Sequence, residues 1–256
     1  MTIENNMNEG YANSYSSFVY AIYNGSTIKG IDFENVNIIS TLNASTIAGY
    51  VENATIANCN YVSGSVNAYH NKDILGVTDN SRANGLVCKL STNSLITSST
   101  VTGYVTLEDG TKVLHQSYEF GNDLGGSINA LNDYVNANGI VYYADDNTAV
   151  IKENYFNGVI NVYNSINSIA GITGYSAGVI QDNYAKGKFN VYRYNSYISG
   201  LLYNGQQSFT LKNNYSATEF NMLKGGTIKV LNNIMNTATN YEVSKNYYLV
   251  DSVSSP

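Results

Sequence analysis

A five-residue pattern that recurs along the second half of the chain constrains the fold more than any other feature of the sequence. Each copy reads aliphatic residue, two polar residues, Asn, Tyr, and successive copies lie about 29 to 32 residues apart. The four copies are Ile151–Tyr155, Ile180–Tyr184, Leu211–Tyr215 and Val243–Tyr247. A fixed period of about 20 to 50 residues is typical of solenoids and other repeat architectures.

Two further elements recur with the same period, and the pattern extends upstream. A small residue followed by Gly opens each unit, at Asn138-Gly139, Ala170-Gly171 and Ser199-Gly200, and at Ala48-Gly49 and Asn84-Gly85 in the first half. Alternating apolar residues close it, at Val159–Val162, Phe189–Val191 and Phe220–Met222. Ile56–Tyr61 carries the Asn-Tyr pattern with one inserted residue, and Ile28–Phe33 resembles a degenerate first copy. Alternation with period two indicates strands.

These elements predict an all-β fold, a parallel β-solenoid of about six to seven coils of roughly 30 residues, with about three short strands in each coil. Stacked coils would place Asn154, Asn183, Asn214 and Asn246 in an amide ladder, and Tyr155, Tyr184, Tyr215 and Tyr247 in an aromatic column. We interpret both as structural, because a catalytic residue would occur once. The composition agrees: 43% hydrophobic and 12% charged residues exclude a disordered chain, and abundant Asn, Ser, Thr and Tyr exclude a coiled coil.

The repeat fails between about Leu107 and Asn138. Within this stretch Ile128, Leu131 and Val135 have the i, i+3, i+7 spacing of a short amphipathic helix, so we predict an irregular excursion with a possible short helix over Ser127 to Val135. The chain, residues 1–256, is then a single β-solenoid domain, with N-terminal coils over 17–105, an irregular insertion over 106–137 and C-terminal coils over 138–250. We expect it to be a fragment of a longer protein.

The repeat resembles the GLUG-motif repeats of bacterial surface proteins, found in some IgA-specific endopeptidases, autotransporter passengers and large adhesins. The similar copy is Gly171-Ile-Thr-Gly174-Tyr175, followed by Val179–Gly187, which reads VIQDNYAKG. In other copies Tyr142, Tyr203, Cys88 and Glu52 occupy the place of the motif's last Gly. The resemblance implies a β-solenoid, a bacterial origin and an extracellular or cell-surface location, and it brings no active site.

The charge and the cysteine content of the chain limit which partners, metals and cofactors it could bind. A net charge of −6 and scattered basic residues argue against nucleic acid, and the near-cluster Lys186, Lys188, Arg193 is expected to face solvent. No apolar run is long enough for membrane insertion. Cys59 and Cys88 are expected to be buried free thiols, although a bridge stays open, and without a His/Cys cluster we expect no metal site and no cofactor.

Residues that could carry catalysis are few. His70 and His115 lie in no nucleophile motif, and His115, near Asp109 and Asp123, is interpreted as a loop residue. The carboxylates Asp145, Asp146, Glu153 and Asp182 could act as acid and base or hold calcium, as in polysaccharide-active solenoids, but Asp145-Asp146-Asn147 equally suits a polar turn. The sequence therefore assigns no catalytic residue and no metal ligand, and it leaves the binding residues unknown.

The surplus of tyrosine points to recognition. Of the 24 tyrosines, seven are too many for one narrow core column, so several of them should face solvent: Tyr142, Tyr143, Tyr163, Tyr192, Tyr194, Tyr197 and Tyr203. Exposed Tyr suits glycan or protein recognition, and a merely β-prone surface is the alternative. We expect a non-enzymatic adhesin or stalk whose partner is a glycan or a host or cell-surface protein. The alternative function is a polysaccharide-active β-helix enzyme, a lyase or glycoside hydrolase.

Overall fold

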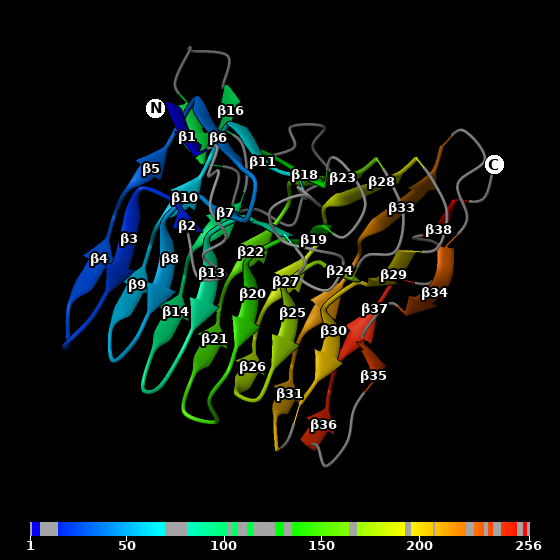
Figure 1. The fold of residues 1–256 in the computed structure, drawn as a ribbon. Helices are drawn as coiled ribbons and strands as arrows, with labels where there is room; N and C mark the ends of the chain where they lie inside the picture. The colour runs from blue at the N-terminus through cyan, green and yellow to red at the C-terminus, as the bar shows by residue number, and fades with distance from the viewer. Residues whose placement is uncertain are drawn as a thin grey trace.

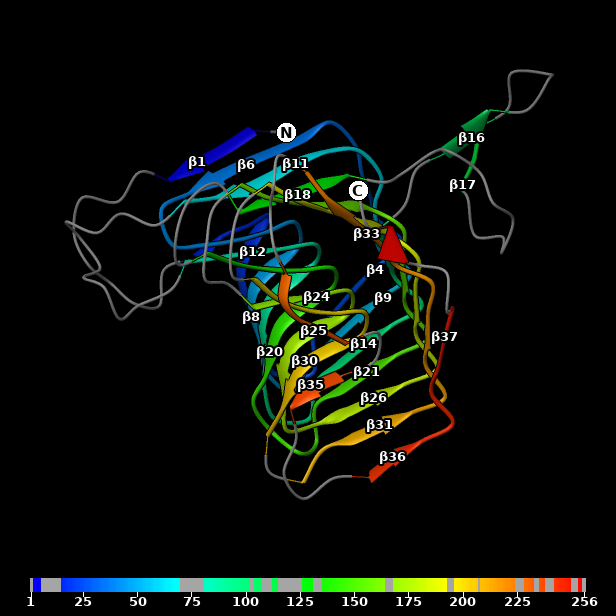
Figure 2. The ribbon, with the colours of Figure 1, turned by 90° about the vertical axis from the view of Figure 1, so that its right-hand side faces the viewer.

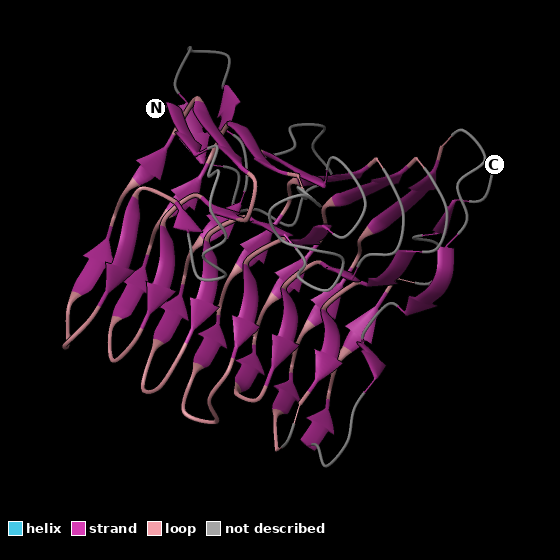
Figure 3. Cartoon of the chain, viewed as in Figure 1, coloured by secondary structure: helices cyan, strands magenta, loops and turns pink. Residues whose placement is uncertain are grey.

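The computed structural model describes residues 2–5, 15–69, 81–101, 104–106, 112–114, 126–130, 135–163, 168–192, 196–206, 208–223, 228–232, 235–237, 242–249 and 253–254. Within these residues the chain forms short strands and no helix (Figure 3). The strands line up in five parallel sheets, each of which receives one strand from every turn of the chain (Figure 1). The predicted parallel β-solenoid is confirmed.

We name the sheets A to E in the order in which the chain visits them. Sheet A contains β1 (Thr2–Asn5), β6 (Val36–Ser40), β11 (Gly64–Ala68), β18 (Ser127–Ala130), β23 (Val159–Val162), β28 (Lys188–Val191), β33 (Glu219–Met222) and β38 (Val253–Ser254). Sheet B contains β2 (Tyr15–Ser16), β7 (Asn43–Ser45), β12 (Ser81–Asn84), β19 (Val135–Asn138), β24 (Ser168–Ala170), β29 (Ser196–Ser199) and β34 (Ile228–Asn232).

The other three sheets have seven strands each. Sheet C contains β3 (Val19–Ile22), β8 (Ala48–Val51), β13 (Val87–Leu90), β20 (Val141–Ala144), β25 (Thr173–Ser176), β30 (Leu202–Gly205) and β35 (Met235–Thr237). Sheet D contains β4 (Thr27–Lys29), β9 (Thr55–Ala57), β14 (Leu95–Thr97), β21 (Val150–Lys152), β26 (Val179–Gln181), β31 (Thr210–Lys212) and β36 (Glu242–Ser244). Sheet E contains β5 (Asp32–Phe33), β10 (Asn60–Tyr61), β15 (Thr100–Val101), β22 (Tyr155–Phe156), β27 (Tyr184–Ala185), β32 (Tyr215–Ser216) and β37 (Tyr247–Tyr248).

One coil is a run of five strands, one in each sheet from A to E. We number the coils 1 to 7 from the N-terminus, so that coils 4, 5 and 6 are β18–β22, β23–β27 and β28–β32. The sequence predicted about three strands per coil, and that number was wrong. Strands of two to four residues separated by sharp corners are too short to show period-two alternation, so sheets B and E escaped notice.

Equivalent residues of successive coils lie above one another, so the core consists of stacked columns of side chains. The three-residue strands of sheet D point their central side chain inward and the two flanking ones outward. The central residues are in register from coil to coil and fully buried from coil 2 to coil 6, at Ile56, Ile96, Ile151, Ile180 and Leu211. Each coil thus buries its apolar face against its neighbours, about 4.8 Å away.

The repeated glycines allow the coils to approach closely between sheets B and C. A Cβ atom on Gly85 would lie 1.8 Å from the carbonyl oxygen of Gly139, and one on Gly139 would lie 1.9 Å from that of Gly171. Gly171 has the same relation to Gly200, at 2.1 Å. Any side chain here would push neighbouring coils apart, so the column requires glycine.

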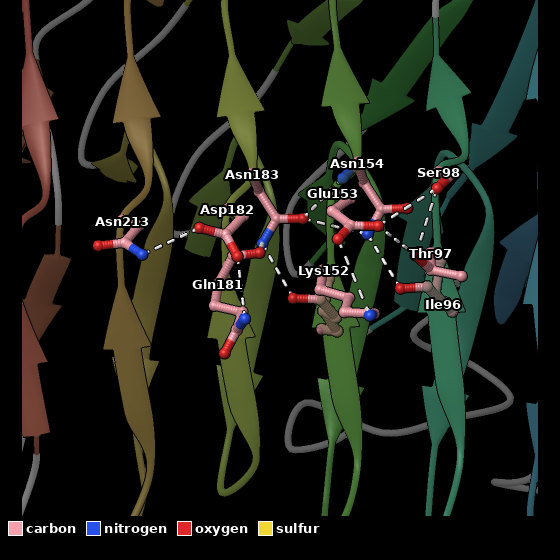
Figure 4. A network of polar contacts seen from close by, with 11 residues as sticks. Ile96, Thr97, Ser98, Lys152, Glu153, Asn154, Gln181, Asp182, Asn183 and Asn213 are labelled. Carbon is pink, nitrogen blue, oxygen red and sulfur yellow. Dashed lines mark hydrogen bonds and ion pairs between the residues drawn. The ribbon is translucent and has the colours of Figure 1, made fainter.

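The predicted asparagine ladder is confirmed at the corner between sheets D and E (Figure 4). Asn183 Oδ1 accepts hydrogen bonds from the backbone N–H and the Nδ2 of Asn154, at 3.0 and 3.1 Å. Asn183 Nδ2 donates to the carbonyl oxygen of Ile151, at 2.9 Å, and to Asn214 Oδ1, at 3.0 Å. Asn214 and Asn246 repeat the pattern one coil further on. Each amide therefore satisfies buried backbone groups of its own coil and of a neighbour.

The residue before each ladder position adopts a left-handed backbone. Its φ angle is +57° at Glu153, +56° at Asp182 and +55° at Asn213, a conformation that costs L-residues other than Gly, Asn and Asp about 1 to 2 kcal/mol. The buried amide that follows holds this corner in place. The residue type at this position varies because its side chain is exposed, as it is at Glu153, Asp182 and Asn213.

Two upstream copies were aligned wrongly from sequence. Asn60 pairs with Thr100, which pairs with Tyr155, so Cys59 and Ser99 occupy the ladder position in coils 2 and 3. Ala48-Gly49 is likewise not the opening of a unit, because Ala48 pairs with Val87 in sheet C. Asn60 lies one residue past the ladder position, and Ala48 lies three residues past Ser45, which pairs with Asn84 at the true opening of the unit.

The predicted helix over Ser127 to Val135 is wrong for the residues that the structure describes. Ile128 lies in β18, paired with Val66 and Ile160, and Val135 lies in β19, paired with Ser81. Both side chains are fully buried in coil 4, and Leu131 lies outside the described residues. Two inward-facing residues in consecutive strands, separated by a connection, reproduced a helical spacing by chance.

The structure places β18 and most of β19 within the predicted insertion as regular strands of coil 4, and the other described strands of this stretch form an antiparallel hairpin. It joins β16 (Tyr104–Thr106) to β17 (Lys112–Leu114), between the last strand of coil 3 and the first strand of coil 4. Figure 2 shows it projecting away from the stack of sheets. The solenoid therefore continues in register past the interruption, through the pairing of β15 with β22.

Candidate functional site

The outer surface of sheet C gathers tyrosines because its strands depart from simple alternation. In β20 both central residues, Tyr142 and Tyr143, are half-buried on the outside, between the buried Val141 and Ala144. Strand β30 repeats this arrangement with Tyr203 and Asn204. Sheet C therefore presents up to two adjacent outward side chains per coil, where a regular strand would present one.

In coils 2, 3 and 5 the first of these two positions is occupied by a small buried residue. It is Gly49 in β8, Cys88 in β13 and Gly174 in β25. A Cβ on Gly49 would lie 2.2 Å from the Cβ of Tyr15, so a neighbouring tyrosine covers this glycine. The register thus places Gly49, and not Glu52 as predicted, at the position of the motif's last Gly, which is Gly174 in coil 5.

The tyrosines of sheets B and C in coils 4 to 6 form one continuous cluster, which we call the tyrosine face and define as Tyr142, Tyr143, Tyr175, Tyr197 and Tyr203. Tyr175 makes edge-to-face contacts with Tyr142 and Tyr203, with ring centroids 5.5 and 5.3 Å apart and ring planes inclined at 71° and 77°. Tyr143 contacts Tyr175 edge to face, and Tyr197 contacts Tyr203 in the same way. Such pairs are favoured by the ring quadrupoles and hold the face in a fixed shape.

Two cations border the tyrosine face on the side of coil 3. The Arg82 guanidinium lies 4.7 Å from the centre of the Tyr142 ring, and the Lys89 ammonium lies 5.4 Å from that of Tyr50. Lys89 Nζ is also 2.6 Å from Asp145 Oδ2. Burial lowers the pKa of Lys89, but the hydrogen bond and charge of Asp145 outweigh burial and raise it, so this lysine stays cationic.

A hollow adjoins the tyrosine face at the corner between sheets C and D. It spans coils 4 to 6, has a volume of about 640 Å³ and is lined by Asp145, Asp146, Asn147, Ala177, Asn204, Gly205, Gln206 and Ser208. The Tyr143 hydroxyl donates a hydrogen bond of 2.8 Å to Gln206 Oε1 and so connects the two features. Burial, and then the charge of Asp145, raise the pKa of Tyr143, which keeps this donor protonated at neutral pH.

The structure does not bring the four candidate carboxylates together. Asp145 and Asp146 lie at the C–D corner, whereas Glu153 and Asp182 lie at the D–E corner, at the far end of the sheet D strands (Figure 4). Asp146 Oδ1 accepts hydrogen bonds from the backbone N–H and hydroxyl of Thr148, which lower the pKa of Asp146. Both of these carboxylates therefore have partners within the fold, as expected of a polar turn.

The other two carboxylates have partners as well. Glu153 Oε2 accepts a hydrogen bond from Thr97 Oγ1, at 3.2 Å, and Asp182 accepts hydrogen bonds from Gln181, at 2.9 Å, and from Asn213, at 3.0 Å. Among the described residues there is no group of three or more His, Cys, Asp or Glu side chains that could hold a metal ion. His70, His115, Asp109 and Asp123 lie outside the part of the chain that the structure describes.

The surplus tyrosines named from the sequence fall into two places. Tyr142, Tyr143, Tyr197 and Tyr203 belong to the tyrosine face, as predicted for solvent-facing residues on neighbouring coils. Tyr163 and Tyr192 stack on each other near the end of sheet A, with centroids 4.7 Å apart, and Tyr163 is 40% exposed. Tyr194 and Arg193 lie outside the described residues, and Lys188 pairs with Glu219 at 3.3 Å.

Sequence reasoning missed several members of the site. It did not single out Tyr50, Lys89 and Tyr175 as neighbours of Tyr143, although all four share one register column of sheet C, and it did not name Asn204 or Gln206 as site residues. A signal was present, because Lys89, Tyr143, Tyr175 and Asn204 each follow a column glycine by four residues. Tyr50 follows no column glycine, and only the observed pairing of β8 with β13 places it in the same column.

Both cysteines are buried free thiols, as expected. Burial raises the pKa of Cys88 to about 11, and the hydrogen bonds from Ser45 and Asn84 only partly oppose it. Burial also raises the pKa of Cys59. Neither thiol is therefore a reactive nucleophile at neutral pH.

Comparisons with known proteins leave the site to be judged on its geometry. No protein-family model, no curated protein and no solved structure matches the chain. In the part of the chain that the structure describes, no helix is long and apolar enough to cross a membrane.

Proposed function

We propose that the chain is a non-enzymatic β-solenoid of a bacterial surface protein, which acts outside the cell as an adhesive or stalk module and binds glycans or proteins through the tyrosine face. The observation that carries this proposal is the continuous cluster of half-buried, edge-to-face tyrosines across coils 4 to 6. Aromatic side chains fixed by their neighbours offer contact area at a low cost in conformational entropy. The extracellular location follows from the GLUG-like repeat.

The way in which the rings pack on one another supports the choice of this face. A stacked ring has at least one of its flat faces covered by a neighbour, and Tyr184, between Tyr155 and Tyr215, has both covered. In an edge-to-face pair only one of the two rings loses a face. Neighbouring rings therefore cover fewer ring faces on sheet C than in the stacked column of sheet E.

The alternative function, a polysaccharide-active enzyme, would use Asp145 and Asp146 in the hollow. Asp145 forms an ion pair with Lys89, and hydrogen bonds from the hydroxyl and backbone N–H of Thr148 lower the pKa of Asp146. A general acid requires a carboxyl group whose pKa is raised instead. This contrast favours the binding function.

The test is a binding screen of the folded chain against glycans and host surface proteins, with two matched double variants. Tyr142→Ala/Tyr175→Ala removes two rings of the tyrosine face in coils 4 and 5, and Tyr155→Ala/Tyr184→Ala removes two stacked rings from the same coils. We expect the first variant to weaken binding at least about tenfold, or 1.4 kcal/mol, and the second to bind like the wild type.

Three outcomes would contradict the proposal. One is a blank screen with folded wild-type protein, and another is equal loss of binding in both double variants. The third is depolymerisation of a polysaccharide that Asp145→Ala abolishes, since this would identify an enzyme.

A further inference from the structure

The hollow beside the tyrosine face arises from unequal connections between sheets C and D. Five residues join β20 to β21 in coil 4 and four join β30 to β31 in coil 6, but only Ala177 and Gly178 join β25 to β26 in coil 5. A Cβ on Gly178 would lie 2.3 Å from the Ala149 carbonyl oxygen, so the short connection is packed tightly against coil 4. The notch is thus a fixed part of the fold.

The hollow and the tyrosine face form one continuous surface. Asn204, in the wall of the hollow, is the register neighbour of Tyr175, which is the register neighbour of Tyr143. The hydrogen bond from Tyr143 to Gln206 reaches from coil 4 to coil 6 and passes the short connection of coil 5. A ligand that contacts the rings therefore meets polar side chains at the edge of the same site.

The polar groups of the hollow favour an uncharged partner rich in hydroxyl groups. The described lining contributes two carboxylates, three side-chain amides and the Ser208 hydroxyl, and no cation. The nearby Lys89 ammonium is engaged by Asp145, at 2.6 Å. Carboxylates accept hydrogen bonds from hydroxyl groups, and amides both accept from them and donate to them, whereas the carboxylates would repel an anionic ligand.

We infer that the hollow is a subsite for a neutral oligosaccharide, which lies along the solenoid axis with its sugar rings against the tyrosine face and its hydroxyl groups in the hollow. This inference rests on the proposed function and specifies its ligand. Coils repeat about every 4.8 Å, close to the length of one sugar unit in an extended chain, so successive units meet successive coils. The apolar side of a sugar ring packs on tyrosine, and its rim of hydroxyl groups matches the polar notch.

The experiment compares neutral oligosaccharides of increasing length with uronic-acid and sulfated oligosaccharides, by calorimetry on the folded chain. Gln206→Ala and Asn204→Ala remove amides from the hollow. Gln181→Ala is the matched control. Gln181 is an outward amide of coil 5 at the end of β26 that lies away from the hollow, and its side chain makes one hydrogen bond, to Asp182. We expect neutral chains to bind, the affinity to rise with length, and both hollow variants to weaken Kd about tenfold while Gln181→Ala does not.

Two outcomes would overturn the inference but leave the proposed function standing. One is that acidic oligosaccharides bind as tightly as neutral ones or more tightly. The other is that the folded chain binds a protein ligand and no neutral glycan. Neutral binding that Gln181→Ala weakens as much as Gln206→Ala would also overturn it. Loss of all binding in the wild type would remove the proposed function as well. A thermal unfolding midpoint within a few degrees of the wild type confirms that each variant is folded.

Discussion

Two groups of tyrosines lie on the outside of the same solenoid and are arranged in opposite ways. On sheet E, Tyr155, Tyr184 and Tyr215 stack with centroids 5.1 and 5.2 Å apart and planes within 6° and 23° of parallel. On sheet C, Tyr142, Tyr175 and Tyr203 meet edge to face. The difference follows from what each register column contains.

The sheet E column repeats tyrosine in consecutive coils, so each ring has an identical neighbour in the next coil and stacks on it. The matching column of sheet C mixes Tyr50, Lys89, Tyr143, Tyr175 and Asn204, and the adjacent outward position alternates between tyrosine and small residues. Rings there tilt into unequal spaces. Uniform repetition builds a stacked column, and interrupted repetition builds a surface of edge-to-face rings beside a hollow.

The largest expected effect concerns the amide ladder beneath the stacked column. Asn183→Leu leaves backbone groups of coils 4 and 5 without partners, and we expect it to lower the free energy of unfolding by about 3 kcal/mol. Asn246→Leu, at the last ladder position, removes bonds to one neighbour only and should cost about 1 kcal/mol. Chemical denaturation measures both, and an unchanged stability of Asn183→Leu would show that the ladder does not hold the coils together.

A smaller effect is expected for the stacked rings themselves. Tyr184→Ala removes the ring between Tyr155 and Tyr215, and two aromatic contacts of about 1 kcal/mol each should be lost. Tyr247→Ala is the matched control, because this ring is 61% exposed at the end of the column, and should cost less than 1 kcal/mol. Equal losses would mean that stacking along sheet E contributes nothing beyond each ring's own contacts.

The smallest expected effect concerns Tyr61, a tyrosine of sheet E that is buried inside the solenoid and belongs to neither of the two outer groups. Tyr61 is fully buried, its hydroxyl donates to the Ser127 carbonyl oxygen at 3.1 Å, and burial raises its pKa above the ordinary value of 10.0. The unfolded chain therefore loses this proton first as the pH rises. The stability that Tyr61 provides is complete below about pH 10 and falls by up to about 1.4 kcal/mol per pH unit above it.

Tyr61→Phe should accordingly flatten the decline in unfolding free energy between about pH 10 and pH 11.5 by the equivalent of one proton. At pH 8 the same variant should lose only about 1 kcal/mol, the contribution of the hydrogen bond to Ser127. Denaturation curves collected at several pH values give the slope directly. Parallel slopes for the wild type and the variant would show that Tyr61 ionises without unfolding.

The repeat made the solenoid, its number of coils and the Asn154 to Asn246 ladder predictable from the sequence. Each of these depends on the same residue meeting its own copy in the next coil, so it leaves a visible period. The ladder of sheet A, in which Asn129 donates to Asn67 at 2.8 Å and accepts from Asn161 at 2.8 Å, could have been found in the same way from Asn between apolar residues. Coil 2 was misaligned because Asn60 lies one residue past the ladder position.

The sequence by itself thus determined the coil, its glycine and asparagine columns and the excess of outward tyrosine. Only the tertiary structure decided which tyrosines stack, which meet edge to face, and where a short connection between two longer ones opens a hollow. The physical reason is that these features join unlike residues of different coils. Their contacts depend on exact register and on the lengths of neighbouring corners, and a one-residue slip turns a side chain to the other face.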